Sequence, residues 1–482
     1  MRRTRRLVVA AALCVLGSTA HAALPGGVAR AFRDAGIPLG SVAIVVREAG
    51  QPQPLFAQDA ERPMNPASVM KVVTTYAALE LLGSDYRWKT EAYLAGKLDN
   101  RGTLAGNLVL KGYGDPKITT EQWQAFMADL RAKGLTRITG DLVLDRSFFK
   151  LAEHDPGAFD QEPLRPYNVG PDALLVNFNA VRFAFAPDAA RGAVAVRADP
   201  PLPEIAVSAA PQLVNGDCGD WRALLMPQVD DQRVQATAAF PGRFAASCGE
   251  REWYMALLDH PHYVHGIFTT AFRERGGAFD GGVTEGRPPR NAKPFAVMES
   301  APLYDIVRDV NKLSNNVMAR QIFLTLATTK HPPPATIPLA TDVIRKWLAD
   351  KKLSLPGLVL ENGSGLSRKE RISAGGIARL LAAADASPVR EEFASSLAVA
   401  AMDGTVQKRF RDGTVAGQAL LKTGSLEGVR ALAGYVIDAE GRRFIVAAII
   451  NDPNAARGGV ALDYLVQWVY REAGTYDRAL RR

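Results

Sequence analysis

A serine and a lysine three residues apart, Ser68 and Lys71, are the pair of side chains with the clearest chemical potential in this chain. Apolar or small residues follow as far as Leu82, with a polar start at Asn65 and a glycine at Gly83, which predicts a helix of about four turns. Residues three apart near a helix start project from one face. A neutral lysine amine there can accept the serine proton, and burial or a second cation nearby would lower the lysine pKa as this requires.

The same spacing recurs at Ser147 and Lys150, so the two residue types alone are weak evidence. These residues follow a strand-like run and are followed by a turn-forming segment, residues 154–157. Because no helix is expected there to hold the two side chains on one face, we discount this second pair.

A second motif, Ser314 and Asn316, is the single Ser-x-Asn sequence of the chain. It lies at the junction of two segments with helical periodicity, residues 303–310 and 314–328. A turn between helices would present both side chains, although a plain helix cap is the ordinary alternative.

A third motif, Lys422, Thr423 and Gly424, is the single Lys-Thr-Gly sequence, and an apolar strand is predicted directly after it, from Val429. Taken alone it fits a turn into a strand. The three motifs together, in this order and on these elements, match the set that class A β-lactamases and penicillin-binding proteins use.

On these motifs the chain resembles the low-molecular-mass class C penicillin-binding proteins, the D-alanyl-D-alanine carboxypeptidase/endopeptidases. The resemblance extends over essentially the whole chain after the N-terminal leader. The long insertion between Ser68 and Ser314 distinguishes this class from compact β-lactamases. Further segments with a familial pattern are residues 112–116, 166–168, 175–179, 361–367 and 421–428.

The resemblance implies an acyl-enzyme mechanism, with Ser68 as the nucleophile and Lys71 as its general base. Ser314 would relay a proton to the departing amine. The backbone N–H groups of Ser68 and Ser425 would form an oxyanion hole, and water would then hydrolyse the ester.

The resemblance also implies a substrate-binding set. Asn316 would hold the peptide backbone of the substrate and Lys71. Lys422 would face the terminal carboxylate or polarise the hydroxyl of the Ser-x-Asn motif, and Thr423 and Ser425 would offer hydroxyl groups to that carboxylate.

The expected protein is therefore a serine DD-peptidase that acts on the terminal D-Ala-D-Ala of peptidoglycan stem peptides and, more widely, on D-Ala cross-links. β-Lactam antibiotics would be covalent inhibitors, and no cofactor is expected. Two alternatives stay open, a β-lactamase and a catalytically silent peptidoglycan-binding scaffold. Asn315 stands where lactamases favour Asp, and Ser425 where many relatives have Thr, which leaves the carboxylate preference open.

Three histidines within six residues, His260, His262 and His265, raise the alternative of a metal site. Pro261 interrupts helical spacing, and no acidic or cysteine partner lies at ligand spacing. We predict a surface helix junction there and no metal.

The N-terminus has the pattern of a secretory signal peptide. Four arginines precede an apolar run, residues 7–16, and small residues end at Ala22, which predicts cleavage after residue 22 and export, most simply to a periplasm. Without these four arginines the net charge of +8 falls to +4. Because the chain has no basic run, this charge does not indicate a nucleic-acid-binding surface.

The cysteine count also fits an exported protein. Loss of Cys14 with the leader leaves Cys218 and Cys248, an even pair in an oxidising compartment. They predict one disulfide closing a loop of about 30 residues, which would contribute roughly 3 kcal/mol of stability. Two free thiols are the alternative.

The pattern of predicted elements favours an α/β (α+β) fold, and with the resemblance a β-lactamase/DD-peptidase-like transpeptidase domain. We predict that this domain comprises residues 23–85 and 290–482 and that residues 86–289 form a mostly β insertion of two subdomains. A mean hydropathy of −0.05 argues against a polytopic membrane protein. A final amphipathic helix, 460–472, would touch a bilayer at most peripherally through Tyr464, Val466 and Trp468, or pack on the core. The oligomeric state is left open, with a dimer as one alternative.

Overall fold

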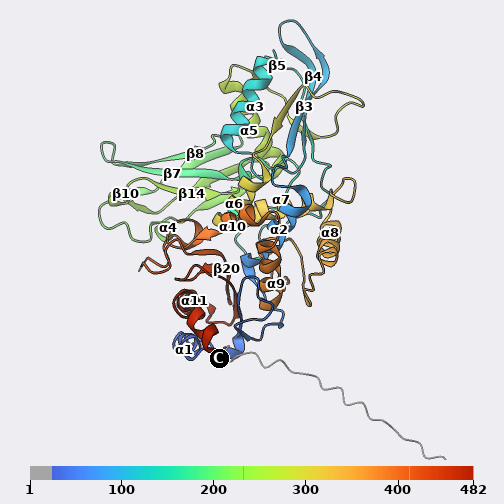
Figure 1. Cartoon of the computed structure of the whole chain (residues 1–482). Helices are drawn as coiled ribbons and strands as arrows, with labels where there is room; N and C mark the ends of the chain where they lie inside the picture. The colour runs from blue at the N-terminus through green and yellow to red at the C-terminus, as the bar shows by residue number, and fades with distance from the viewer. Residues whose placement is uncertain (1–23, 232, 412, 481–482) are drawn as a thin grey trace, which may run out of the picture.

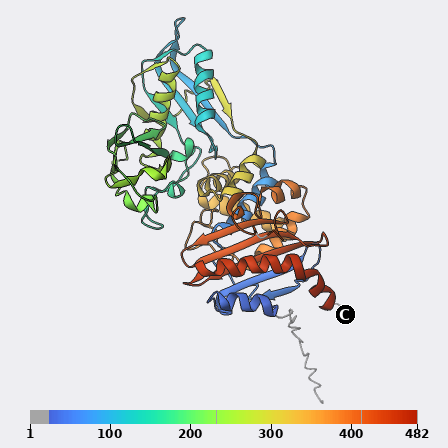
Figure 2. The ribbon, with the colours of Figure 1, turned by 90° about the vertical axis from the view of Figure 1, so that its left-hand side faces the viewer.

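The protein has two lobes, which are separated most clearly in Figure 2. The structure is a computed structural model that describes residues 24–231, 233–411 and 413–480. The lower lobe contains both ends of the described chain, and the middle of the sequence forms the upper lobe (Figure 1). The predicted signal peptide, residues 1–22 with Cys14, lies outside the described residues.

An antiparallel six-stranded sheet is the centre of the lower lobe, in the order β18-β19-β20-β21-β1-β2. It unites the two ends of the chain, because β1 pairs along its whole length with β21. Two antiparallel hairpins form part of it, β1 with β2 and β20 with β21. The strands are β1 (Val42–Glu48), β2 (Phe56–Gln58), β18 (Ala398–Val399), β19 (Ala419–Leu426), β20 (Val429–Ile437) and β21 (Arg443–Asn451).

Helices cover both faces of this sheet, which explains why β20 and β21 are apolar on both sides. The first and last helices, α1 (Gly26–Asp34) and α11 (Gly459–Leu480), cover one face. The other face carries α2 (Lys71–Leu82), α6 (Leu303–Leu313), α7 (Asn316–Ala327), α8 (Ile337–Asp350), α9 (Ala374–Asp385) and α10 (Arg390–Ser396).

The final helix packs on the core, which was one of the two alternatives drawn from its sequence. Val466 and Trp468 are buried, and the Trp468 ring meets Phe56 edge to face with centroids 5.4 Å apart. Tyr464 remains partly exposed. Within the described ranges, every helix is too short or too polar to span a bilayer.

The upper lobe contains three sheets and two main helices, α3 (Thr120–Ala132) and α5 (His260–Glu274), around a separate apolar core. The largest sheet consists of β3 (Lys89–Leu98), β4 (Thr103–Gly112), β5 (Arg137–Ile138), β6 (Leu142–Asp145), β15 (Ala278–Phe279), β16 (Val283–Glu285) and β17 (Ala296–Glu299). Because β17 pairs with β3, this sheet includes residues beyond the predicted boundary at residue 289. The predicted division into domains stays a prediction.

Two smaller sheets form an arm that extends to the left in Figure 1. One consists of β7 (Val181–Asp188), β8 (Ala193–Asp199), β10 (Gln212–Val214), β13 (Arg243–Ala245) and β14 (Arg251–Met255). The other consists of β9 (Ile205–Ala209), β11 (Gln228–Asp231) and β12 (Ala236–Ala239), and a short helix, α4 (Trp221–Leu224), follows β10.

One expected strand was partly wrong. The apolar run from Leu174 to Phe185 predicts a single strand, but β7 begins only at Val181. Asn177, Phe178 and Asn179 have φ values of 44°, 55° and 53°, in the left-handed region, and the chain turns there. Asparagine favours turns, but the aromatic and aliphatic residues around Asn177 and Asn179 give the run the sequence pattern of a strand.

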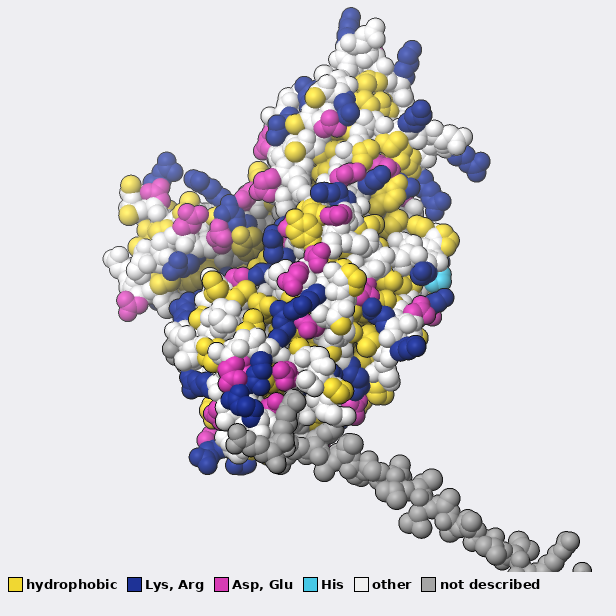
Figure 3. All heavy atoms as spheres, viewed as in Figure 1, with side chains coloured by type: hydrophobic (Ala, Val, Ile, Leu, Met, Phe, Trp, Pro, Cys, Tyr) yellow, Lys and Arg dark blue, Asp and Glu magenta, His cyan; other side chains and the backbone are white. Residues whose placement is uncertain are grey.

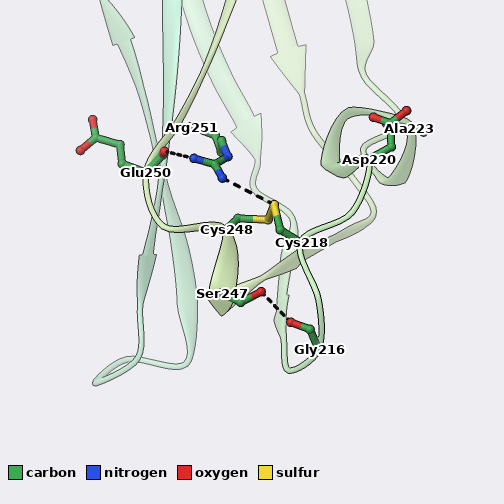
Figure 4. Close-up of a disulfide and its surroundings, with 8 residues drawn as sticks. All are labelled: Gly216, Cys218, Asp220, Ala223, Ser247, Cys248, Glu250 and Arg251. Carbon is green, nitrogen blue, oxygen red and sulfur yellow. Dashed lines mark hydrogen bonds between the residues drawn. A yellow bond between two sulfur atoms is a disulfide. The ribbon is translucent and has the colours of Figure 1, made fainter. Parts of the chain in front are cut away.

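A disulfide joins Cys218 and Cys248 in the arm, with their Cα atoms 4.7 Å apart (Figure 4). It links the loop after β10 to the 3₁₀ turn after β13, two strands that already pair in parallel. Beside it, Ser247 Oγ donates a hydrogen bond to the Gly216 carbonyl at 2.6 Å.

On the face shown in Figure 3, Lys and Arg side chains are interspersed with Asp and Glu side chains and form no single basic surface.

Candidate active site

Ser68 and Lys71 lie at the start of the central helix of the lower lobe. Ser68 is in a 3₁₀ turn, Ala67–Met70, that leads directly into α2. Helix α2 is apolar almost all round and is therefore buried, which takes Lys71 to zero exposure while Ser68 keeps some. Lys71 Nζ lies 3.0 Å from Ser68 Oγ, so the amine is within proton-transfer distance of the hydroxyl.

The second Ser-x-x-Lys sequence has no such arrangement. The Ser147 hydroxyl donates to Asp145 Oδ1 at 2.6 Å, in a turn after β6, and Lys150 is exposed. The two Ser-x-x-Lys sequences therefore differ in the way that the prediction assumed: the first lies at the start of a helix and the second does not.

Lys71 is surrounded by hydrogen-bond acceptors and by charge. Its Nζ also contacts Asn316 Oδ1 at 2.6 Å and the Ser364 carbonyl at 2.5 Å. Burial, reinforced by the positive charge of Lys422, holds the pKa of Lys71 well below its usual value. Glu370 acts in the opposite direction. A lowered pKa increases the fraction of the amine that is neutral at a given pH, and a neutral amine can serve as a base.

The Ser-x-Asn motif forms the corner between α6 and α7. Ser314 ends α6 in the left-handed conformation, with φ 59° and ψ 34°, which is uncommon for a residue other than glycine. Asn315 caps α7 by accepting the Met318 N–H at 3.0 Å. Because the middle residue is the cap, Ser314 and Asn316 remain available to contact the two lysines.

Lys422 lies on β19 and meets the corner from the sheet side. It is fully buried, and its Nζ donates to Ser314 Oγ at 2.8 Å and to the Thr423 carbonyl at 2.9 Å. Burial lowers the pKa of Lys422 to about 7. The Thr423 hydroxyl bonds the hydroxyl of Thr405 at 2.7 Å, and Ser425 is exposed farther along the strand.

Strand β19 passes directly beside the turn that carries Ser68. A Cβ on Gly424 would lie 2.5 Å from the Pro66 carbonyl oxygen and 3.1 Å from the Ser68 nitrogen, so only glycine fits this approach. Gly424 directly precedes Ser425, so this contact brings the backbone of Ser68 close to the start of Ser425. The backbone N–H groups of these two serines could together stabilise an oxyanion.

The outer edge of β19 is open beside these residues. In the described chain β18 pairs only with Leu420 and Leu421, so the edge from Lys422 to Ser425 has no strand opposite it. An extended peptide can add to such an edge through main-chain hydrogen bonds.

All seven residues expected in the site, from Ser68 to Ser425, therefore converge on the region where α2, the α6–α7 corner and β19 meet. Sequence reasoning missed four groups: the Ser364 carbonyl, which accepts from Lys71, the charges of Glu370 and Arg320, which act on the pKa of Lys71, and Thr405, which bonds Thr423. The sequence of segment 361–367 predicts a loop that is shaped by its glycines and at most borders the cleft, and not a catalytic element. The Ser364 carbonyl is a backbone group, so no residue type in the sequence could reveal it. Glu370 lies nine residues after Glu361, and an acidic residue at that distance from the start of a loop is no recognisable motif.

The histidine segment forms the beginning of α5, with Pro261 in the first turn. His262 Nδ1 donates to Asp259 and His265 Nδ1 donates to Glu204, so each of these two rings has a carboxylate partner. In the part of the chain that the structure describes, no group of three or more suitable side chains could hold a metal ion.

Comparison with known proteins gives concordant matches over nearly the whole chain. Residues 26–471 match the model of the D-Ala-D-Ala carboxypeptidase 3 (S13) family. The D-alanyl-D-alanine carboxypeptidase DacB of Haemophilus influenzae is 26% identical over 418 residues, 86% of each chain. The D-alanyl-D-alanine carboxypeptidase of Actinomadura sp. strain R39 is 27% identical over 436 residues, 87% of this chain and 79% of the relative.

The crystal structure of penicillin binding protein 4 (dacB) from H. influenzae superposes with a TM-score of 0.76 at 24% identity, covering 92% of this chain and 99% of that one. This likeness shows the same β-lactamase/DD-peptidase type of fold that the sequence predicted. Because the family model accounts for almost every described residue, the chain belongs to the D-Ala-D-Ala carboxypeptidase 3 (S13) family.

Proposed function

We propose that this protein is a serine DD-peptidase that removes the terminal D-Ala from peptidoglycan stem peptides through an acyl-enzyme at Ser68. The contact of Lys71 Nζ with Ser68 Oγ, inside a buried site with two lysines, is the observation that carries this proposal. Family membership supports the choice of substrate class.

Acylation begins when neutral Lys71 takes the proton of Ser68 and Oγ bonds to the carbonyl carbon of the penultimate D-Ala. The oxygen of the tetrahedral intermediate accepts from the backbone N–H groups of Ser68 and Ser425. The C–N bond then breaks as Ser314 relays to the leaving amine the proton that Lys71 took from Ser68, so the terminal D-Ala departs and Lys71 is neutral again. Lys422, at 2.8 Å from Ser314 Oγ, polarises that hydroxyl. Water hydrolyses the ester and restores Ser68.

The substrate lies along the open edge of β19 in this proposal. Its terminal carboxylate meets Lys422 and the hydroxyl groups of Thr423 and Ser425. Asn316 holds the peptide backbone and keeps its contact with Lys71. The hydroxyl pair of Thr405 and Thr423 extends this polar surface toward the leaving group.

The wider activity on D-Ala cross-links and the covalent binding of β-lactams follow from the same nucleophile. The H. influenzae penicillin binding protein 4 has been solved with a β-lactam, and a Bdellovibrio bacteriovorus peptidoglycan endopeptidase shares the fold with a TM-score of 0.51 at 17% identity. Export to the periplasm remains part of the proposal, since it rests on the leader sequence.

Intact mass spectrometry after incubation with benzylpenicillin tests the proposal. We expect one covalent adduct on the wild type and on Ser147→Ala, and none on Ser68→Ala. Absence of an adduct with the drug intact would favour the silent scaffold. Absence of an adduct with rapid hydrolysis of the drug would favour a β-lactamase.

A further inference from the structure

A buried carboxylate next to the active site has an unusual set of partners. Glu370 has zero exposure, and its two oxygens accept four backbone N–H groups. Oε1 accepts from Glu361 at 3.0 Å, Asn362 at 2.9 Å and Gly363 at 2.8 Å, and Oε2 accepts from Gly365 at 2.8 Å. Bonds to an ionised acceptor are about twice as strong as neutral ones, so this carboxylate fixes the backbone of the loop 361–365.

This loop contacts the helix that carries the base. The Ser364 carbonyl accepts from Lys71 Nζ at 2.5 Å, and the Gly363 carbonyl accepts from Thr74 Oγ1 at 2.7 Å. Both partners lie on one face of α2, three residues apart. The loop is therefore bonded to α2 through two of its carbonyl groups.

The loop also contacts the turn that carries the nucleophile. Gly365 has φ +79°, and a Cβ there would lie 1.9 Å from the Ala67 carbonyl oxygen and 2.8 Å from the Ser68 nitrogen. The turn of Ser68 is thus enclosed between Gly365 on one side and Gly424 of β19 on the other. A shift of the loop would move the base and the nucleophile relative to each other.

The hydrogen-bond count at Lys71 shows why the Ser364 carbonyl matters. A neutral amine has two N–H groups and one lone pair, and Nζ has three neighbours. Asn316 Oδ1 and the Ser364 carbonyl can only accept, so they take both N–H groups. The lone pair is left for the Ser68 hydroxyl, which is the orientation a general base needs.

We infer that Glu370 is a positioning residue of this active site: by ordering the loop it fixes the Ser364 carbonyl, which directs the lone pair of Lys71 at the Ser68 hydroxyl. The inference rests on the proposed function, since it concerns the proton transfer that activates Ser68.

Charge gives Glu370 a second, separable effect. Three charged groups face Lys71: Lys422 from β19, Arg320 from α7, and Glu370 from the segment before α9. Burial, Lys422 and Arg320 lower the pKa of Lys71, and Glu370 is the one that raises it. Loss of its negative charge should therefore lower that pKa further and move the acid limb of the acylation rate to lower pH.

The test is the second-order rate of acylation by benzylpenicillin as a function of pH, normalised to the fraction of protein that becomes acylated. Glu370→Gln keeps the size of the side chain, but its Nε2 cannot accept the Gly365 N–H. We expect a plateau about 10- to 100-fold lower, because small misplacements of reacting groups cost this much. We also expect an acid limb shifted down by about half to one pH unit.

Two further variants separate charge from position. Glu370→Asp restores the charge on a shorter side chain, so its acid limb should return to the wild-type position while its plateau stays low. Glu361→Gln is the matched control on the same loop, because Glu361 bonds Ser367 and Lys369 instead of the loop backbone. Its plateau and limb should match the wild type.

A Glu370→Gln profile that superposes on the wild type in both plateau and limb would overturn the inference, as would the same loss in Glu361→Gln. Normalising to acylated protein removes any unfolded fraction, so a merely structural role would leave the plateau unchanged. A wild type that forms no adduct at any pH would instead contradict the proposed function.

Discussion

Two buried lysines in one site have different tasks because their surroundings differ. Lys71 contacts three oxygens, and burial and Lys422 lower its pKa, which suits a base. Lys422 has one hydroxyl and one carbonyl as partners and a pKa of about 7, so a fraction of it carries charge near neutral pH. Fixed donors in a site without bulk water stabilise developing negative charge strongly.

This pKa predicts an alkaline limb. Above pH 7, Lys422 loses its proton and with it the charge that meets a terminal carboxylate. We expect kcat/KM for an acylated D-Ala-D-Ala peptide to fall as pH rises through about 7, because kcat/KM reports the free enzyme. The matching D-Ala-D-alaninamide, which lacks the carboxylate, should show a flatter profile. Parallel decline for both peptides would contradict a role of Lys422 in binding the carboxylate.

At the scale of elements, two of the three motifs coincide with an element boundary that the sequence pattern reveals. Lys71 opens an apolar helix, and Ser314 separates two periodic segments. Lys422 instead lies inside β19, the strand that precedes the predicted apolar strand from Val429. Glu370 and the Ser364 carbonyl could not be predicted in this way. Their roles depend on how a loop packs against α2, which no local pattern records.

The approach of β19 to the Ser68 turn gives a prediction at this scale. In Gly424→Ala the new Cβ would clash with the Pro66 carbonyl, so strand and turn must separate and the oxyanion site widens. We expect acylation by benzylpenicillin to slow on the order of 100-fold. Stopped-flow measurement checks this.

The control is another glycine-to-alanine change in open space. Gly459, at the start of α11, has a negative φ, and no atom lies within 4 Å of the place that an added methyl group would take. Gly459→Ala should therefore keep the wild-type rate. Equal rates for Gly424→Ala and the wild type would show that this contact does not shape the site.

At the scale of the whole molecule, the upper lobe is bonded directly to the helix that begins with Asn316. Gln321 Nε2 donates to the carbonyls of Asp172 at 2.7 Å and Asp115 at 3.3 Å, and its Oε1 accepts the Asp172 N–H at 3.0 Å. One residue earlier, Arg320 donates to the Val169 carbonyl at 3.0 Å. The upper lobe therefore supports α7 through backbone groups that precede the arm in the chain.

The disulfide belongs to a part of the upper lobe that makes none of these contacts. It joins Cys218 and Cys248 across 30 residues of the arm, and the bonds drawn around it in Figure 4 stay within the arm. Closing a loop of this length restricts the unfolded chain and stabilises the fold by roughly 3 kcal/mol. The effect should therefore be on the stability of the upper lobe and not on the chemistry.

The double variant Cys218→Ser/Cys248→Ser tests this separation. We expect its thermal unfolding at a lower temperature than the wild type, by a loss of roughly 3 kcal/mol, and its acylation rate at 25 °C within about twofold. Wild type treated with a reductant should reproduce the thermal shift, which excludes an effect of the serines themselves. Slower acylation well below the unfolding temperature would show that the arm supports the active site, because a stability effect alone leaves the folded population, and hence the measured rate, unchanged.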